Sequence, residues 1–286
     1  MNNKRVFISA DHGLAIVYFL QSDVVQTLLN AGVEVVLLTD DVLQEKIQTL
    51  FARPGLIIEG LRFEQAKKYF QKEHNSIQWW LDFLRRVGAS NRINLQAVDS
   101  YIHQVEAEAH TRRRMLFPFM KGVTRLLRHS QVARRQLMHE QNRFTPDIYS
   151  DLFERYRPDL VIASTPGWRY DRYLLREAVR RKVPTIAAIV GWDNTSSYSL
   201  PGAKVDWVNC WSEIQKQELV LGSDWEPSRV NIGGIPSYDG YFRRTWVVPR
   251  PDYFYQHGLD PERKLITHAC SFVKKRELSD DLFTFI

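Results

Sequence analysis

Two scarcities narrow the classes of protein that this sequence can encode. Its 286 residues include only two cysteines, Cys210 and Cys270, which lie far apart in the chain. They exclude a disulfide-stapled scaffold, and neither belongs to a Cys-x-x-Cys pair that would indicate a structural zinc site. The longest apolar run covers residues 14–20, whereas a membrane span needs about 20 apolar residues. The first residues lack the pattern of a signal peptide, so we expect a cytoplasmic protein.

Several motifs that bind phosphate or activate a nucleophile are also missing. The sequence contains no G-x-x-x-x-G-K-[ST] loop, no G-x-G-x-x-G after the first predicted strand and no G-x-S-x-G elbow. These absences disfavour a P-loop NTPase, a dinucleotide-binding enzyme and a hydrolase of the nucleophile-elbow type. The spacing of histidine, cysteine and acidic residues indicates no metal site. We therefore expect no metal and no bound cofactor.

Positive charge is concentrated in one segment of the chain. The formal net charge is +6 at pH 7, and residues 111–140 contain eight Lys or Arg residues but a single acid. The remainder is close to neutral, which indicates a local anion-binding surface. A membrane-facing set of cations is predicted here: Arg112, Arg113, Arg114, Lys121, Arg125 and Arg128. No RNA-binding motif accompanies the charge, so we expect no nucleic-acid partner.

The same segment predicts an amphipathic helix. Leu116, Met120, Val123 and Leu127 follow helical spacing, and the cations form another stripe. Such a helix fits the surface of an anionic bilayer, with the Trp79-Trp80 pair as interfacial anchors. The alternative is the solvated face of a helix that packs on a core.

Strand-like and helical segments alternate along the chain. The predicted strands are residues 4–9, 33–39, 56–61, 158–163, 184–190, 205–210, 229–233 and 264–269. Helices are predicted over 14–31, 171–182 and 213–221, the first ending at Gly32 and the last beginning after Ser212. This order predicts an α/β protein with a doubly wound parallel sheet.

The predicted protein has three parts. Residues 1–240 form the sheet domain, with a long helical insert over 62–156 that contains no convincing strand. Residues 241–262 hold several prolines and are predicted to be a linker. Residues 263–286 begin a second domain.

The loop after the first strand carries the first candidate site. Right-handed crossovers bring the carboxyl ends of all strands to one edge of the sheet, where ligands bind. His12 would lie at a helix N-terminus, whose dipole disfavours the imidazolium and favours a neutral base. Asp11 could orient the ring or act in its place, and Gly13 lets the backbone approach a ligand. The alternative is an Asp N-cap beside an exposed histidine.

Three further loops follow strands at the same edge. In the loop 191–197, Asp193 and Asn194 could bind hydroxyls and Trp192 could stack on a sugar or base; the alternative is an Asx turn with a packed Trp. Gly234 and Pro236 form a rigid turn that could line a cleft or simply leave the domain. In the loop 165–171, Arg169 could meet an anion, but we favour a structural role in which Asp171 caps the next helix.

Five segments taken in order resemble a known family. They are the Asp-His-Gly loop, PDLVIAST, VPTIAAIVGWDNTSS, DWVNCWSEIQKQE and VNIGGIPSYDGY. Together they resemble bacterial glycosyltransferases of the two-Rossmann (GT-B) type that act in surface-polysaccharide synthesis. The resemblance covers about residues 4–40 and 158–272, and the helical insert carries none of it.

The resemblance implies a Rossmann-like first domain that binds the acceptor and a second domain that binds a nucleotide-sugar. It places the catalytic base on His12 or Asp11, the cleft lining around Asp193 and Pro236, and Ser271 near the donor diphosphate. The family has a second domain of about 150 residues or more. Only the first strand and turn of such a domain follow here, so we expect a truncated donor domain.

We therefore expect a glycosyltransferase that moves a sugar from a nucleotide-sugar, its co-substrate, to a polysaccharide or lipid-linked acceptor. One alternative is a sugar-nucleotide 2-epimerase or polyol-phosphate transferase of the same fold. The other is a non-catalytic membrane-surface or scaffold protein. An anionic membrane surface, the inner face of the cell membrane, is a further expected partner.

Overall fold

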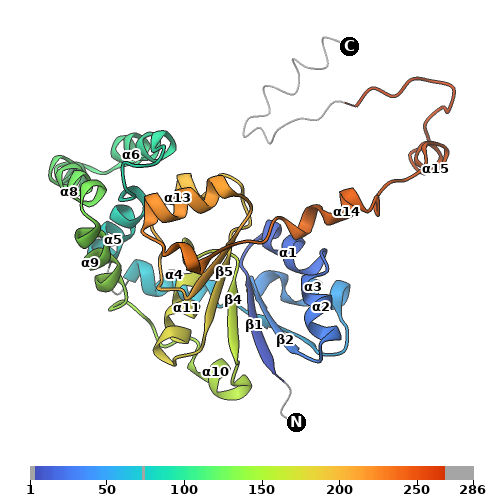
Figure 1. Ribbon diagram of the computed structural model, residues 1–286, viewed down its shortest axis with the longest axis horizontal. Helices are drawn as coiled ribbons and strands as arrows, with labels where there is room; N and C mark the ends of the chain where they lie inside the picture. Colours follow the sequence, from blue (N-terminus) through green and yellow to red (C-terminus); the bar gives the residue numbers. More distant parts are fainter. Residues whose placement is uncertain (1–3, 73–74, 268–286) are drawn as a thin grey trace. The chain divides into compact units, whose positions relative to one another are not determined.

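The computed structural model describes residues 4–72 and 75–267. The chain divides into two compact units, and the boundary in the sequence falls between Gly240 and Tyr241. The first unit contains a seven-stranded, all-parallel sheet in the order β3-β2-β1-β4-β5-β6-β7 (Figure 1). Its strands are β1 (Arg5–Ala10), β2 (Glu34–Thr39), β3 (Leu56–Gly60), β4 (Leu160–Ala163), β5 (Thr185–Ala188), β6 (Trp207–Cys210) and β7 (Val230–Ile232). This is the Rossmann-like, doubly wound α/β fold that the alternation of segments predicts.

Side chains of successive strand residues enter two different cores, because they point to opposite faces of the sheet. In β1, Phe7 belongs to one core and its neighbours Val6 and Ile8 belong to the other. In β2, Val36 and Val35 divide in the same way. Both faces of the sheet are therefore buried, which explains why the central strands are continuous apolar runs rather than alternating ones.

Helices cover both faces of the sheet. On the side of Ile8 lie α1 (Gly13–Leu20), α2 (Val24–Asn30) and α3 (Gln44–Phe51), which Figure 1 shows together beside β1 and β2. On the side of Phe7 lie α4 (Phe63–Lys72), α10 (Ser150–Tyr156), α11 (Asp171–Arg180) and α13 (Glu213–Ser223). Short turns of helix complete the unit: η1 (Asp41–Leu43), α12 (Asn194–Tyr198), η2 (Pro227–Arg229) and η3 (Pro236–Tyr238).

The segment between β3 and β4 is helical, as predicted. Besides α4 and α10 it contains α5 (Asn75–Val87), α6 (Gln96–Glu108), α7 (Thr111–Arg114), α8 (Phe117–His129) and α9 (Gln131–Gln141). These helices bury a core of their own around Phe83, Val98, Phe117 and Leu127. Trp79 and Trp80 pack against that core, so they are not free interfacial anchors.

A buried charge cluster joins the insert to the sheet helices. Asp82 of α5 pairs with Arg85 at 2.8 Å and with Arg172 of α11 at 2.5 Å. Burial opposes ionisation of Asp82, but the two guanidinium groups outweigh it and lower the pKa of this carboxyl. The pairing keeps all three charges satisfied where the two layers meet.

The helix predicted over residues 14–31 is instead two helices. The chain leaves the helical path at residues 21–23, where the Ser22 hydroxyl bonds to the Tyr18 carbonyl and accepts a hydrogen bond from the Val24 amide at 3.3 Å. A serine that replaces backbone partners in this way ends one helix and starts another. The helix predicted after Ser212 is confirmed, since the Ser212 hydroxyl accepts from the Gln215 amide at its start.

The second unit differs from the sequence prediction in two ways. The predicted linker contains α15 (Arg250–Gln256), with Pro249 at its N-cap and Pro251 in its first turn, where proline is tolerated. The helix α14 (Asp239–Phe242) spans the start of the same segment. Residues 264–267 form no strand, so this part of the strand predicted over 264–269 is wrong.

Candidate functional site

The sheet order places a topological switch point between β1 and β4. From β1 the chain moves outward through β2 to β3, and after the insert it returns to the other side of β1 and continues from β4 to β7. Ligands of open α/β sheets bind in the crevice at such a point, beyond the carboxyl ends of the strands. Ser9 of β1 lies beside Ala163 of β4, so the loops that start with Ala10 and Ser164 leave the sheet side by side.

Asp11 and His12 form a close pair at this point. Oδ1 of Asp11 lies 2.5 Å from Nδ1 of His12. The Asp11 carboxylate is buried, whereas the His12 side chain is about one quarter exposed. Because an ionised carboxylate only accepts hydrogen bonds, Nδ1 carries the proton and Nε2 of the neutral ring is left as the basic nitrogen. The structure thus brings together the two residues that the sequence predicts as catalytic.

Two residues of the β4 loop hold Asp11 in place. The Ser164 hydroxyl donates to Oδ1 at 2.6 Å, and Nε of Arg169 forms an ion pair with Oδ2 at 2.7 Å. Burial by itself would raise the pKa of Asp11, but the hydrogen bonds from His12 and Ser164 and the charge of Arg169 outweigh it and lower that pKa. Asp11 is therefore ionised at neutral pH and able to orient and stabilise the His12 ring.

Asp171 is a second buried carboxyl beside this cluster. Its Oδ2 accepts from the Thr165 hydroxyl at 2.6 Å and its Oδ1 accepts from the Arg169 amide at 3.2 Å. Burial and the negative charge of Asp11 raise the pKa of Asp171 to about 7. The prediction that Asp171 is the N-cap is wrong: Tyr170 holds that position, and Asp171 is the first residue of α11. Its carboxylate turns back to stabilise the loop.

A cavity of about 220 Å³ adjoins the cluster. Its walls are Phe70, Asp82, Arg169, Tyr170 and Arg172. The side chain of Arg169 is about half exposed and belongs both to this cavity and to the Asp11 ion pair. A ligand in the cavity would therefore contact the group that pairs with the Asp11 carboxylate.

The loop after β5 presents its polar residues outward. Trp192 is 74% exposed, Asp193 is exposed and Asn194 is partly buried. Gln215 of α13 holds the loop by donating to the carbonyls of Gly191 at 2.9 Å and Trp192 at 2.8 Å. Since the indole does not pack inside the protein, the loop has the exposure that ligand stacking requires.

His12 and Asp193 lie at the same edge of the sheet but do not bond to each other. Only β4 separates β1 from β5. With neighbouring strands about 4.8 Å apart, the two loops start about 10 Å from each other. Within the described part of the chain, no hydrogen bond or ion pair joins these two side chains. One extended ligand could reach both.

The remaining predicted substrate residues lie near α1 or outside the described ranges. Gly234 has a φ of +73°, a conformation that favours glycine, and η3, which starts at Pro236, packs against α1. A Cβ added to Gly13 would meet no atom within 4 Å, so the backbone there is open to a ligand. Ser271 lies outside the described residues.

The predicted cationic set divides into paired and free residues. Arg128 pairs with Asp99 at 2.7 Å and Lys121 pairs with Glu106 at 2.7 Å. The Arg113 guanidinium lies 4.1 Å from the centre of the Trp79 ring. The other three, Arg112, Arg114 and Arg125, are exposed. The basic stripe of α8 is therefore partly used in packing the insert.

Sequence reasoning missed Ser164 and Thr165 as site residues. The signal that could have found them is their position directly after a predicted strand, next to the switch point. Over residues 4–72 and 75–267, no three His, Cys, Asp or Glu side chains are arranged to hold a metal ion. Likewise, the described chain contains no helix that is long and apolar enough to cross a bilayer.

Comparison of the sequence with protein-family models and with curated proteins gives no match.

Proposed function

We propose that this chain activates an acceptor hydroxyl for glycosyl transfer from a nucleotide-sugar. The observation that carries the proposal is the pair of Asp11 and His12 at the switch point, with Nδ1 and Oδ1 2.5 Å apart. In the proposed step, Nε2 of His12 takes the proton of the acceptor hydroxyl while that oxygen bonds to the anomeric carbon. The bond from this carbon to the diphosphate breaks, and the nucleoside diphosphate leaves with the electron pair.

The surroundings of His12 support this role. When Nε2 takes a proton, the ring becomes an imidazolium, and the ionised Asp11 stabilises it across the short hydrogen bond. The Ser164 hydroxyl donates to the same oxygen, Oδ1, and Arg169 pairs with the other oxygen, Oδ2. A base held in this way contributes about 10²- to 10⁴-fold to the rate of proton abstraction.

The surfaces around the pair suit a carbohydrate acceptor. Tyr170 and Phe70 line the cavity next to Arg169, and the exposed Trp192 lies on a loop at the same sheet edge. Aromatic side chains stack on the apolar faces of sugar rings, while Asp193 and Asn194 can bind hydroxyls. These features favour a polyhydroxylated acceptor over an apolar one.

The test is product analysis with a panel of UDP-, GDP- and dTDP-activated sugars and a CDP-polyol, with and without lipid-linked and polysaccharide acceptors. We expect acceptor-dependent release of the nucleotide, reduced about 10²- to 10⁴-fold in His12→Gln and Asp11→Asn. Lys46→Gln, an exposed site on α3, is the matched control and should keep full activity. Release at the same rate from His12→Gln would overturn the proposal.

The same products separate the two related chemistries. A 2-epimerase would return an epimerised sugar without any need for an acceptor. A polyol-phosphate transferase would release a nucleoside monophosphate from a CDP-polyol. Neither pattern is expected if His12 activates an acceptor hydroxyl for attack on an anomeric carbon.

A specific surface favours an anionic membrane as a second partner. Met115 and Phe119 are 76% and 66% exposed, and Leu116 between them is also exposed. The exposed Arg112 and Arg114 lie directly before them. Large apolar side chains beside arginines are typical of segments that dock on anionic bilayers. Such docking would bring the site to a lipid-linked acceptor, and a vesicle-binding test is given in the Discussion.

A further inference from the structure

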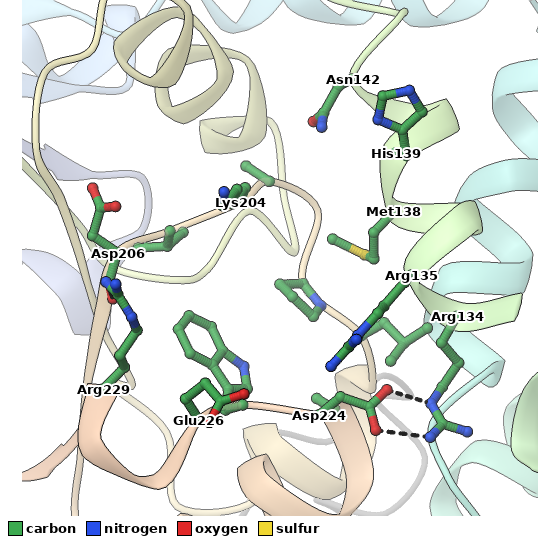
Figure 2. A pocket seen from close by; sticks show the side chains of 16 residues that line it. Arg134, Arg135, Met138, His139, Asn142, Lys204, Asp206, Asp224, Glu226 and Arg229 are labelled. Atoms are coloured by element: carbon green, nitrogen blue, oxygen red, sulfur yellow. Dashed lines mark hydrogen bonds and ion pairs between the residues drawn. The ribbon is translucent and has the colours of Figure 1, made fainter. Parts of the chain in front are cut away.

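A cavity of about 510 Å³ lies away from the catalytic pair (Figure 2). Its walls come from α9, from residues 200–206 before β6 and from residues 223–229 before β7. These segments enter the amino ends of β6 and β7, whereas His12 lies beyond the carboxyl end of β1. The cavity therefore lies at the opposite edge of the parallel sheet and does not belong to the site described above.

Some charges on the cavity wall are already satisfied within the protein. Arg134 of α9 makes two hydrogen bonds to Asp224, at 2.7 and 2.8 Å, which are drawn as dashed lines in Figure 2. Asp206 accepts from the amide and the hydroxyl of Thr185, at 2.9 and 3.0 Å. These pairs build the wall and leave the other charged residues for a ligand.

Three charged side chains on the wall have no such partners. Among the residues that the structure describes, neither Arg135 nor Lys204 forms a side-chain hydrogen bond or an ion pair, and the carboxylate of Glu226 forms none. In Figure 2, Arg135 extends from α9 into the open space, opposite the segment that carries Glu226. The cavity thus offers two cations and one separate carboxylate.

Part of the wall is apolar and includes an indole. Met138, Leu200 and Val205 line the cavity together with Trp225. Nε1 of Trp225 is buried and has no hydrogen-bond acceptor among the described residues. Protein atoms cover this nitrogen, so the indole offers the cavity its ring and not its N–H.

We propose that this cavity binds a nucleotide. The base would pack against Trp225 and Met138. The Glu226 carboxylate would accept hydrogen bonds from sugar hydroxyls, and Arg135 and Lys204 would bind the phosphate. A volume of about 510 Å³ lies within the usual range of small-molecule sites.

The location makes this nucleotide an effector and not a substrate of the transfer step. The site lies at the other edge of the sheet from His12, so no group of the bound nucleotide reaches the reacting atoms. This proposal is therefore independent of the glycosyl-transfer proposal. Its test measures nucleotide binding and not enzymatic turnover.

Isothermal titration calorimetry tests the proposal on the full chain, with uridine 5′-monophosphate, adenosine 5′-monophosphate and inorganic phosphate as probes. We expect saturable binding of at least one nucleotide that is stronger than that of inorganic phosphate. The double variant Arg135→Glu/Lys204→Glu should weaken it at least tenfold, and Trp225→Ala, which removes the ring that packs on the base, about tenfold. Lys46→Glu and His12→Gln should bind as the unsubstituted protein does.

Four results would overturn it. They are no saturable binding of either nucleotide at millimolar concentration, equal binding of inorganic phosphate and nucleotides, unchanged affinity in the charge-reversed double variant, and loss of binding in His12→Gln. Circular dichroism of each variant establishes that it is folded. If the double variant does not fold, Lys204→Glu alone decides, since Lys204 is exposed and unchanged affinity there excludes this cation from the site.

Discussion

The carboxyl groups of Asp11 and Asp171 are both buried near the switch point, yet their pKa values move in opposite directions. Hydrogen bonds from His12 and Ser164 and the charge of Arg169 lower the pKa of Asp11 despite its burial. Burial and the charge of Asp11 raise the pKa of Asp171 to about 7. Environments that separate two neighbouring carboxyls in this way are typical of sites that move protons.

Asp171 should make the protein less stable as the pH rises from about 4 to 7. In that range the unfolded chain has released the Asp171 proton, whereas the folded chain keeps it until its pKa near 7. The unfolded state then binds fewer protons, so the free energy of unfolding falls with pH. Asp171→Asn removes this titration. We expect a flatter curve of Tm against pH for this variant. Between pH 4 and 7 the unsubstituted protein should lose at least about 1 kcal/mol more stability than the variant, or about 2–4 °C more in Tm.

Thermal unfolding at closely spaced pH values from 4 to 8 measures this difference. Asp193→Asn is the control, because that carboxylate is exposed and lies at the same sheet edge. Parallel curves for the unsubstituted protein and Asp171→Asn would show that the Asp171 carboxyl titrates alike in both states.

Gly202→Ala should destabilise the protein strongly. A Cβ at Gly202 would lie 1.8 Å from the carbonyl oxygen of Gly167, and this oxygen cannot shift easily because it belongs to the backbone. We expect a loss of at least about 2 kcal/mol in the free energy of unfolding. Gly122→Ala is the opposite control: it lies inside α8 with no atom within 4 Å of the added Cβ, so it should stabilise by about 0.5–1 kcal/mol. Urea unfolding of the two variants decides, and equal stabilities would contradict the predicted clash.

The sheet could be predicted from the sequence because its central strands are buried on both faces. Runs such as residues 33–39 and 158–163 are apolar on both faces, which distinguishes them from the amphipathic helices between them. The pair of Asp11 and His12 was also predictable, since both follow the first strand directly.

The partners of this pair were not predictable in the same way. Ser164 and Arg169 are more than 150 positions from Asp11, and only the parallel pairing of β1 with β4 brings them to it. The position of the Asp171 carboxyl likewise depends on the Thr165 hydroxyl, which the fold of the loop brings to it. The helix break at Ser22 was missed because its hydrophobic spacing continues through the break.

The 510 Å³ cavity could not be found from the sequence at all. Its walls come from three segments that lie apart in the sequence, and none of them carries a binding motif. Arg135 counts in the sequence only as one more cation of the basic segment. Its position in the cavity wall, opposite the segment that carries Glu226, results from the fold and cannot be predicted from the local sequence.

The buried ion pair of Arg134 and Asp224 should contribute far more to stability than an exposed pair of the same helix. The side chains of Arg134 and Asp224 are only 6% and 14% exposed. Asp224→Asn leaves the Arg134 charge buried without a counter-charge, while Asn still accepts the left-handed backbone at this position, where φ is +58°. We expect a loss of about 3 kcal/mol in the free energy of unfolding.

Glu140→Gln is the comparison for this prediction. Its partner Arg143 is mostly exposed, so the change should cost less than about 1 kcal/mol. Urea denaturation of both variants under identical salt measures the difference. If Asp224→Asn costs no more than Glu140→Gln, the buried pair does not support the junction between α9 and α13.

Replacing exposed apolar residues at and just before the start of α8 should weaken binding to anionic vesicles. Met115→Ser/Phe119→Ser removes two large exposed side chains, each worth about 1.5–3 kcal/mol when buried in an apolar phase. Arg112→Glu/Arg114→Glu reverses two exposed charges, each worth about 1 kcal/mol near an anionic surface, and leaves Arg113 over the Trp79 ring. We expect sedimentation with phosphatidylglycerol vesicles to weaken at least tenfold in either variant.

The two variants should differ in their response to salt and lipid charge. The binding that remains in Met115→Ser/Phe119→Ser should disappear at high ionic strength, because it depends on charge alone. Binding of the unsubstituted protein should fall when phosphatidylcholine replaces the anionic lipid. Val42→Ser, which changes an exposed apolar residue far from the arginines, should bind like the unsubstituted protein. Unchanged binding in both double variants would exclude this surface as the docking site.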